Sequence, residues 1–121
     1  IGDPSDIWNV VKWGIDTFDC VSPTRLARHG AALMKTKSGK INIKNSTYKD
    51  DLLPIDINCN CITCNNYSKA YLHHLFKSAE LLVFQLISIH NIYFMNNLMT
   101  YIRKAIEDDN FDEAENRWYL N

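Results

Sequence analysis

Residues 59–64 read Cys59-Asn60-Cys61-Ile62-Thr63-Cys64, which places three thiols within six positions. Each thiolate binds zinc at about 2.3 Å, so three thiolates this close in sequence can converge on one tetrahedral ion. A tetrahedral site needs a fourth ligand, and a site closed by four protein ligands stabilises a fold rather than activating water. The spacing therefore predicts a structural zinc site, with the chain folded around it.

Three downstream histidines are candidates for the fourth ligand. His90 follows Ser88, a residue suited to cap a helix, so we expect His90 in the first turn of a helix, where its imidazole is rigidly mounted. His73 and His74 lie in the middle of another expected helix, where one should face the core and the other solvent. Helix position therefore favours His90 and leaves the other two as alternatives.

A disulfide is the competing interpretation of the cysteine cluster. Cys59 and Cys61 are too close in sequence for an easy mutual bridge, and three clustered thiols leave one unpaired. Nothing in the sequence indicates an oxidising compartment. Three unrelated buried cysteines are a further alternative, which the tight spacing disfavours. Cys20 belongs to another element and is left unassigned.

Length and composition indicate a single folded domain. The chain has 121 residues, 46% hydrophobic and 22% charged, which excludes disordered and collagen-like classes. No segment approaches the ~20 apolar residues of a membrane span. The N-terminus is neither a basic signal region nor an initiator methionine, so we expect no secretory signal, a chain that begins inside a longer protein, and a cytoplasmic location.

The net charge of −1 hides an uneven distribution of charge. Residues 107–115 are strongly acidic, whereas residues 20–49 contain no acidic residue and seven of the thirteen basic ones. A basic face of this kind attracts phosphates, although a solvated lysine-rich hairpin is an equally simple explanation. The seven basic residues are Arg25, Arg28, Lys35, Lys37, Lys40, Lys44 and Lys49.

The pattern of the N-terminal part is that of an α/β unit. A helix is expected from Pro4 to near Gly14, followed by a strand over residues 15–21 that ends in a turn at Ser22-Pro23. A loop over residues 31–38 leads to a turn at Ser38-Gly39 and a strand over residues 40–45.

The remainder is expected to be mainly helical. Residues 52–58 look irregular, and a helix starts at Tyr67. A second helix begins near Ser78 and a third at Ser88, and Asn110 starts a last short helix.

Asp19 lies next to the end of the first expected strand. At the C-terminal end of a barrel strand a carboxylate can act as nucleophile, general base or metal ligand. The simpler interpretation is that Asp19 caps the following turn or pairs with Arg25 or Arg28. Asp16 shares the same face of the strand, so spacing alone does not single out either carboxylate.

Residues 18–30, Phe18-Asp19-Cys20-Val21-Ser22-Pro23-Thr24-Arg25-Leu26-Ala27-Arg28-His29-Gly30, closely resemble the active-site segment of the tRNA-guanine transglycosylases. The resemblance continues through residues 39–45, the cysteine cluster, residues 68–75 and residues 89–91, and so covers nearly the whole chain. The chain resembles the C-terminal portion of a bacterial-type member of this queuine/archaeosine tRNA-ribosyltransferase family, and the eukaryotic catalytic subunit is also similar.

The resemblance implies an α/β fold, namely the C-terminal part of a modified (β/α)8 barrel with an attached, mostly helical zinc subdomain. Residues 1–37 would be the last part of the barrel, with the nucleophile strand and an RNA-contacting turn. Residues 38–121 would be the zinc-binding subdomain and C-terminal helices. Asp19 would be the nucleophile, Arg25 and Arg28 would contact RNA, and zinc would be held by Cys59, Cys61, Cys64 and His90.

The family exchanges guanine at the tRNA anticodon wobble position for a 7-deazaguanine, in bacteria 7-aminomethyl-7-deazaguanine, on the route to queuosine. The implied partners are therefore the tRNA anticodon loop and the base substrate, with a homodimer for the full-length protein and no membrane. A complete barrel needs about 250 residues, so we expect this chain alone not to exchange bases and to be poorly soluble or self-associating.

Two other functions stay open from the residues. One is a zinc-stabilised RNA-binding module without catalysis. The other is an interaction protein whose helices form a subunit interface.

The loop from Ala31 to Ser38 is expected to be longer than in the bacterial pattern of the family.

Overall fold

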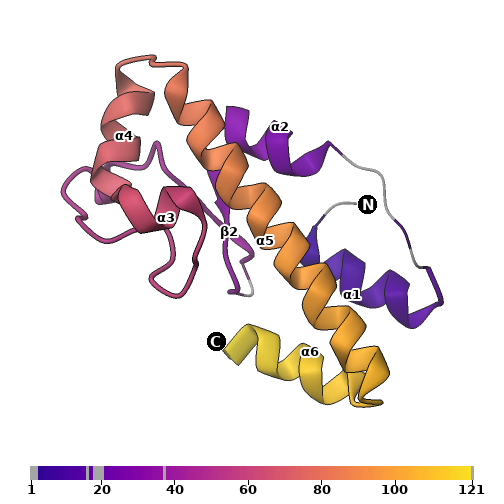
Figure 1. Ribbon diagram of the computed structural model, residues 1–121. Coiled ribbons are helices and arrows are strands. Elements are labelled where there is room, and N and C mark those ends of the chain that lie inside the picture. Colours follow the sequence, from indigo (N-terminus) through magenta and orange to yellow (C-terminus); the bar gives the residue numbers. More distant parts are fainter. Residues whose placement is uncertain (1–2, 16, 18–20, 37, 121) are drawn as a thin grey trace.

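The computed structural model describes residues 3–15, 17, 21–36 and 38–120, and it is organised around one long helix (Figure 1). The other helices and a two-stranded hairpin all pack along this helix, α5. The elements in chain order are α1 (Pro4–Lys12), α2 (Ser22–Arg28), β1 (Ala31–Leu33), β2 (Lys40–Asn42), a 3₁₀ turn (Ser46–Tyr48), α3 (Ile62–Asn66), α4 (Lys69–Lys77), α5 (Leu82–Glu107) and α6 (Phe111–Leu120).

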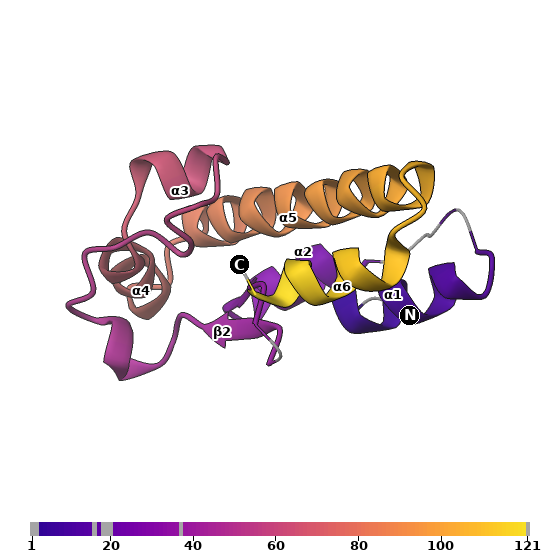
Figure 2. The same ribbon diagram turned by 90° about the horizontal axis from the view of Figure 1, so that it is seen from below.

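The two halves of α5 serve different parts of the molecule. Helices α3 and α4 lie at its N-terminal end, and α6 runs back beneath its C-terminal half (Figures 1 and 2). Helix α2 and the hairpin lie on the same side of α5 as α1 and α6 (Figure 2). Among the described residues, no helix combines the length and the apolar character needed to cross a bilayer.

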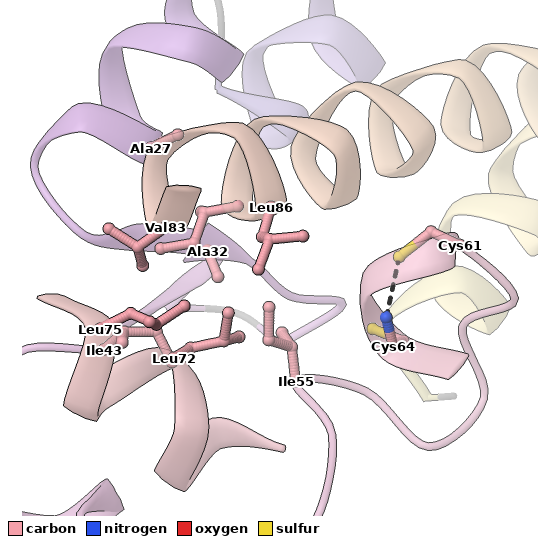
Figure 3. Close-up of a cluster of buried hydrophobic side chains, with 11 residues drawn as sticks. Ala27, Ala32, Ile43, Ile55, Cys61, Cys64, Leu72, Leu75, Val83 and Leu86 are labelled. Atoms are coloured by element: carbon pink, nitrogen blue, oxygen red, sulfur yellow. Dashed lines mark hydrogen bonds between the residues drawn. The ribbon is translucent and has the colours of Figure 1, made fainter. Parts of the chain in front are cut away.

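The buried apolar side chains form two clusters along α5. In the first cluster, Val83, Leu86 and Ile87 of α5 pack against α4 and the loops around the hairpin (Figure 3). In the second cluster, the C-terminal half of α5 packs against Trp8 of α1 and Trp118 of α6. Burying each large side chain stabilises the fold by about 1.5–3 kcal/mol, so both clusters contribute to holding α5 in place.

The hairpin is short and its register is fixed. Strands β1 and β2 are antiparallel, with Ala32 opposite Ile41 and Leu33 opposite Lys40. Only His29 and Gly30 separate α2 from the first hairpin strand, and Gly30 has a φ of +81° that favours glycine. A Cβ there would lie 3.1–3.2 Å from side-chain atoms of Asn42, Lys44 and Phe76, so helix and strand are joined without room for a larger residue.

The N-terminal expectations are confirmed for the first helix and corrected after it. Helix α1 has Pro4 in its first turn, and Asp3 occupies the N-cap position without a side-chain hydrogen bond. The strand expected over residues 15–21 falls largely on residues outside those described, and Ile15, Thr17 and Val21 are irregular. The turn expected at Ser22-Pro23 is wrong, because these residues begin α2. The fixed φ of proline suits the first turn of a helix as well as it suits a turn.

The hairpin and the helices after it differ from the expected boundaries. The strand expected over 40–45 spans only β2, and its partner β1 occupies residues expected to be loop. Helix α3 was not expected. Helix α4 begins just after Ser68, whose hydroxyl accepts a hydrogen bond from the N–H of Tyr71. Tyr67, the expected start, is instead an extended residue between the two helices. Residues 52–58 are irregular, as predicted.

The helix starts expected at Ser78 and Ser88 are both wrong. Ser78 ends α4, and α5 begins at Leu82 and runs through Ser88 without a break. The buried positions on both sides of Ser88 keep a continuous helical stripe, and this burial overrides the capping preference of a single serine. The last helix is confirmed, since α6 starts directly after Asn110, whose carbonyl accepts the N–H of Ala114.

Candidate metal centre

Three cysteines and one histidine converge at the junction of α3 and α5. Cys61 is the N-cap of α3 and Cys64 lies in its first turn, so the helix start brings both sulfurs to one side (Figure 3). Cys59 comes from the loop just before α3, and His90 projects from α5. Their ligand atoms all lie within 4.8 Å of one another, and no other such group occurs in the described part of the chain.

The distances between these ligand atoms fit a tetrahedral zinc site. Nδ1 of His90 lies 3.7 Å from Sγ of Cys59, 3.7 Å from Sγ of Cys61 and 3.3 Å from Sγ of Cys64. In a tetrahedron with zinc–sulfur bonds near 2.3 Å and a zinc–nitrogen bond near 2.0 Å, sulfur and nitrogen are about 3.5 Å apart. The four residues therefore fit the metal in donor type and in spacing.

Hydrogen bonds around the ligands fix their orientation. Nε2 of His90 lies 2.8 Å from the carbonyl oxygen of Leu33, and because a carbonyl only accepts, Nε2 carries the proton. This leaves the lone pair of Nδ1 directed at the sulfurs. The backbone N–H of Cys64 donates to Sγ of Cys61 at 3.3 Å, which favours the thiolate form of Cys61.

Proton affinities at the site follow from the same contacts. Hydrogen bonds with Cys59 and then with Cys64 hold the pKa of Cys61 far below that of a free thiol. Burial lowers the pKa of His90, but hydrogen bonds with Cys59 and Cys61 outweigh it and raise that pKa to about 9. Zinc must displace protons to bind.

Burial shows what kind of metal site this is. His90, Cys61 and Cys64 are buried, and Cys59 is half-buried. The hydroxyl of Thr63, in α3 between Cys61 and Cys64, donates to the carbonyl of Leu86 at 2.6 Å and ties α3 to α5. Four protein ligands leave no open coordination position for substrate or water, so the centre is structural rather than catalytic.

The other histidine candidates lie away from the metal centre. His73 is buried, and its Nδ1 donates to the carbonyl of Ile43 at 2.7 Å. His74 is exposed on the other side of α4. The expectation that one faces the core and the other faces solvent is confirmed.

The remaining candidate residues do not join the metal centre. Arg25 and Arg28 are exposed, three positions apart on α2, and therefore share one face of that helix. Lys40 and Lys44 are exposed on and just after β2. Asp19, like Asp16, Cys20 and Lys37, lies outside the described residues.

One buried polar residue was not expected from the sequence. Asn91, next to His90 on α5, is fully buried and hydrogen-bonded to the backbone of Pro23 in α2 and of Ala31 and Leu33 in β1. Its signal in the sequence is a polar residue at a buried position of an otherwise apolar helical stripe.

All of the chain, residues 1–121, matches the family model described as Queuine tRNA-ribosyltransferase. The chain belongs to the queuine tRNA-ribosyltransferase family. Its Cys₃His cluster corresponds to the structural zinc of this family. The expectation of one zinc ion held by these residue types therefore agrees with both the geometry and the family.

Curated relatives named queuine tRNA-ribosyltransferase are similar over most of this chain. One from Dehalococcoides mccartyi strain BAV1 is 50% identical over 113 residues, which are 93% of this chain and 28% of the relative. One from Roseiflexus sp. strain RS-1 is 47% identical over 98% of this chain and 30% of the relative. One from Francisella tularensis subsp. novicida is 47% identical over 100% of this chain and 32% of the relative. The chain thus spans less than a third of these relatives and corresponds to their C-terminal part.

Proposed function

We propose that the chain is the C-terminal, zinc-bearing part of a tRNA-guanine transglycosylase. The full protein would exchange guanine at the anticodon wobble position for 7-aminomethyl-7-deazaguanine in queuosine biosynthesis, acting in the cytoplasm on tRNA. The observation that carries the proposal is the match of residues 1–121 to the queuine tRNA-ribosyltransferase family, together with the Cys₃His geometry. Zinc supplies no chemistry to this exchange and holds α3 and its loop against α5.

In this proposal Asp19 is the nucleophile. One carboxylate oxygen bonds to C1′ of the ribose as the glycosidic bond to guanine breaks, and guanine leaves with the bonding electrons and then takes a proton. The incoming base attacks C1′ through the equivalent ring nitrogen, loses its proton there, and displaces the carboxylate. Two displacements give net retention at C1′ and ping-pong kinetics, as in retaining glycosidases.

Helix α2 would bind the anticodon loop through Arg25 and Arg28. Both guanidinium groups are exposed, on a helix that begins three residues after Asp19 in sequence. Lys44 lies next to the C-terminal end of α2, since its side chain approaches Gly30. Charges of this kind hold phosphates and set the position of the RNA, while unstacked loop bases give specificity.

Residues 1–37 would belong to a (β/α)8 barrel and residues 38–121 to the zinc subdomain. Such a barrel needs about 250 residues, and the relatives are about three times as long as this chain, which supports an upstream barrel portion. Ala27 and Ala32 are buried in one cluster with Ile43, so the two parts would pack together without a gap. The upstream portion would carry the base-binding pocket, and this chain alone would be inactive.

The test uses the full-length protein incubated with tRNA and analysed on denaturing gels. Asp19→Ala should abolish the covalent protein–tRNA band and guanine exchange, whereas Asp16→Asn should retain both. A covalent band that survives Asp19→Ala would exclude Asp19 as the nucleophile. Asp19-dependent exchange by the 121-residue chain alone would show that the upstream portion is not needed.

An RNA-binding module without catalysis is the alternative, and the exposed arginines of α2 favour it as much as they favour the enzyme. Under this alternative no covalent band forms with the wild-type protein, and Asp19→Ala leaves tRNA affinity unchanged. We further propose a homodimer for the full-length protein. Sedimentation at two concentrations tests it, and a strict monomer would contradict it.

A further inference from the structure

The side chain of Asn91 connects α5 to both α2 and β1. Its Oδ1 accepts a hydrogen bond from the N–H of Leu33 at 2.9 Å. Its Nδ2 donates to the carbonyl of Pro23 at 2.9 Å and to the carbonyl of Ala31 at 3.0 Å. The amide is fully buried, and its oxygen and both of its protons have backbone partners.

These bonds hold both ends of a short helix. Pro23 lies in the first turn of α2, and Ala31 and Leu33 form the strand that follows it. Ala27 is the buried residue of α2 and packs in the first cluster. Leu26 of α2 is also partly buried against the second cluster. Apolar packing of this kind is not directional, so the hydrogen bonds of the Asn91 amide are what fix the orientation of α2.

The exposed side of α2 carries the charges. Arg25 and Arg28 are exposed on the same helix whose Ala27 is buried. A shift or rotation of α2 about Ala27 would therefore displace both guanidinium groups together. Without the Asn91 amide, the buried N–H of Leu33 and carbonyl of Ala31 would lose this partner, as would the part-buried carbonyl of Pro23, and the contact that holds α2 to α5 at this point would be gone.

We propose that Asn91 is a positioning residue for RNA binding, which fixes α2 against α5 so that Arg25 and Arg28 meet the RNA in a defined arrangement. This rests on the proposed contact of those two arginines with tRNA. Asn91 itself touches no RNA in this arrangement, because it is fully buried. Its effect reaches the RNA only through α2.

The experiment uses the full-length, zinc-loaded protein with tRNA and three variants. Asn91→Ala removes all three hydrogen bonds. Asn91→Asp keeps the shape and one acceptor but places a carboxylate oxygen against two carbonyls. Thr63→Val is the matched control, because it removes one buried side-chain bond to α5 but at α3 rather than at α2. Zinc content is measured for each variant to confirm that the metal centre is intact.

The first measurement is amide hydrogen exchange. We expect both Asn91 variants to increase exchange in residues 22–33 well above any increase in residues 69–77, and Thr63→Val not to do so. Unchanged exchange in residues 22–33 would overturn the proposal. An equal rise in both segments would also overturn it, because Asn91 would then support the fold in general, without a specific hold on α2.

The second measurement is tRNA affinity. Asn91→Ala should weaken binding about tenfold, and Thr63→Val by less than about twofold. Because Asn91 acts through the arginines, Asn91→Ala combined with Arg28→Ala should weaken binding less than the product of the two single effects. A full product would overturn the proposal.

The two proposals fail in different ways. If Arg25→Ala and Arg28→Ala leave tRNA binding unchanged, the proposed RNA contact itself is wrong. If they weaken binding and Asn91→Ala does not, the contact stands and the positioning role of Asn91 is overturned.

Discussion

Nε2 of His90 and the carbonyl oxygen of Leu33 lie 2.8 Å apart, so the imidazole that completes the metal centre is also bonded to the first strand of the hairpin. Nδ1 of the ring faces the cysteines of α3 and of the loop before it, and Nε2 is hydrogen-bonded to β1. One side chain on α5 thereby connects three segments that are distant in sequence. Replacing it should affect both the metal and the hairpin.

We predict one zinc ion per chain and its loss in Cys61→Ala and His90→Ala. Each variant removes one of four ligands, and the remaining three cannot close the tetrahedron. His74→Ala is the matched control, because this exposed histidine lies outside the cluster and should retain the metal. Elemental analysis of the purified variants measures the ratio. Full zinc content in His90→Ala would show that another group completes the site.

As the pH is lowered, zinc should be released at a higher pH than the pH at which α5 and α6 unfold. Zinc binds thiolates and a neutral imidazole, so protons compete with it at all four ligands, and affinity falls as the pH is lowered. A chromogenic chelator would follow the release, and circular dichroism would follow the helices. Zinc retention that is independent of pH would contradict thiolate ligation.

Gly30→Ala should destabilise the zinc-loaded chain more than Gly39→Ala. Both glycines have a φ near +80°, which costs another residue about 1–2 kcal/mol. A new Cβ meets nothing within 4 Å at Gly39 but meets three side chains at 3.1–3.2 Å at Gly30. Overpacking therefore adds a loss of about 1–3 kcal/mol in stability at Gly30 and none at Gly39. Urea unfolding of the two variants gives the comparison, and equal losses would mean that the neighbours of Gly30 move aside freely.

Asp51→Asn should reduce the loss of folding stability that occurs as the pH is lowered below about 4. A hydrogen bond from Lys69, reinforced by the N–H of Leu53, lowers the pKa of Asp51 below its usual 3.8. Since the folded-state pKa is the lower one, the interaction stabilises the fold above about pH 4 and is lost as the pH falls through the folded-state pKa. Thermal unfolding across this range measures it, with Asp50→Asn as control. Parallel profiles for the two variants would rule out this contribution.

The isolated chain should self-associate as its concentration rises. Trp13 is 86% exposed, Leu52 81% and Leu81 75%, and large apolar side chains left in water favour association. Sedimentation velocity at two concentrations detects this. A monomer at both concentrations would show that these side chains are tolerated singly.

The metal ligands could be predicted because three of them lie within six residues, a local signal that needs no tertiary information. The choice of His90 was correct for the wrong local reason, since Ser88 does not start a helix and His90 lies well inside α5. A rigid helix mounts the imidazole in either case. The prediction therefore survived a wrong helix boundary.

What could not be predicted depends on contacts between distant segments. Nothing in Ala31-Ala32-Leu33 marks a strand; it becomes one because β2 pairs with it and the side chain of Asn91 binds its backbone. Likewise, Ser22-Pro23 fits a turn and a helix start equally well, and the helix that forms buries Ala27 in the first cluster and is hydrogen-bonded through Pro23 to Asn91. Such outcomes depend on partners dozens of residues away.

Because α5 runs without a break through both apolar clusters, the number of residues between them fixes how the two clusters are rotated relative to each other about the helix axis. Ile87 faces the first cluster and Phe94 the second, seven residues later, with His90 between them. Each residue added between them would rotate one half of the molecule about 100° relative to the other, whereas seven added residues would nearly restore the alignment. Within this stretch, α5 therefore constrains the number of residues as strictly as their identity.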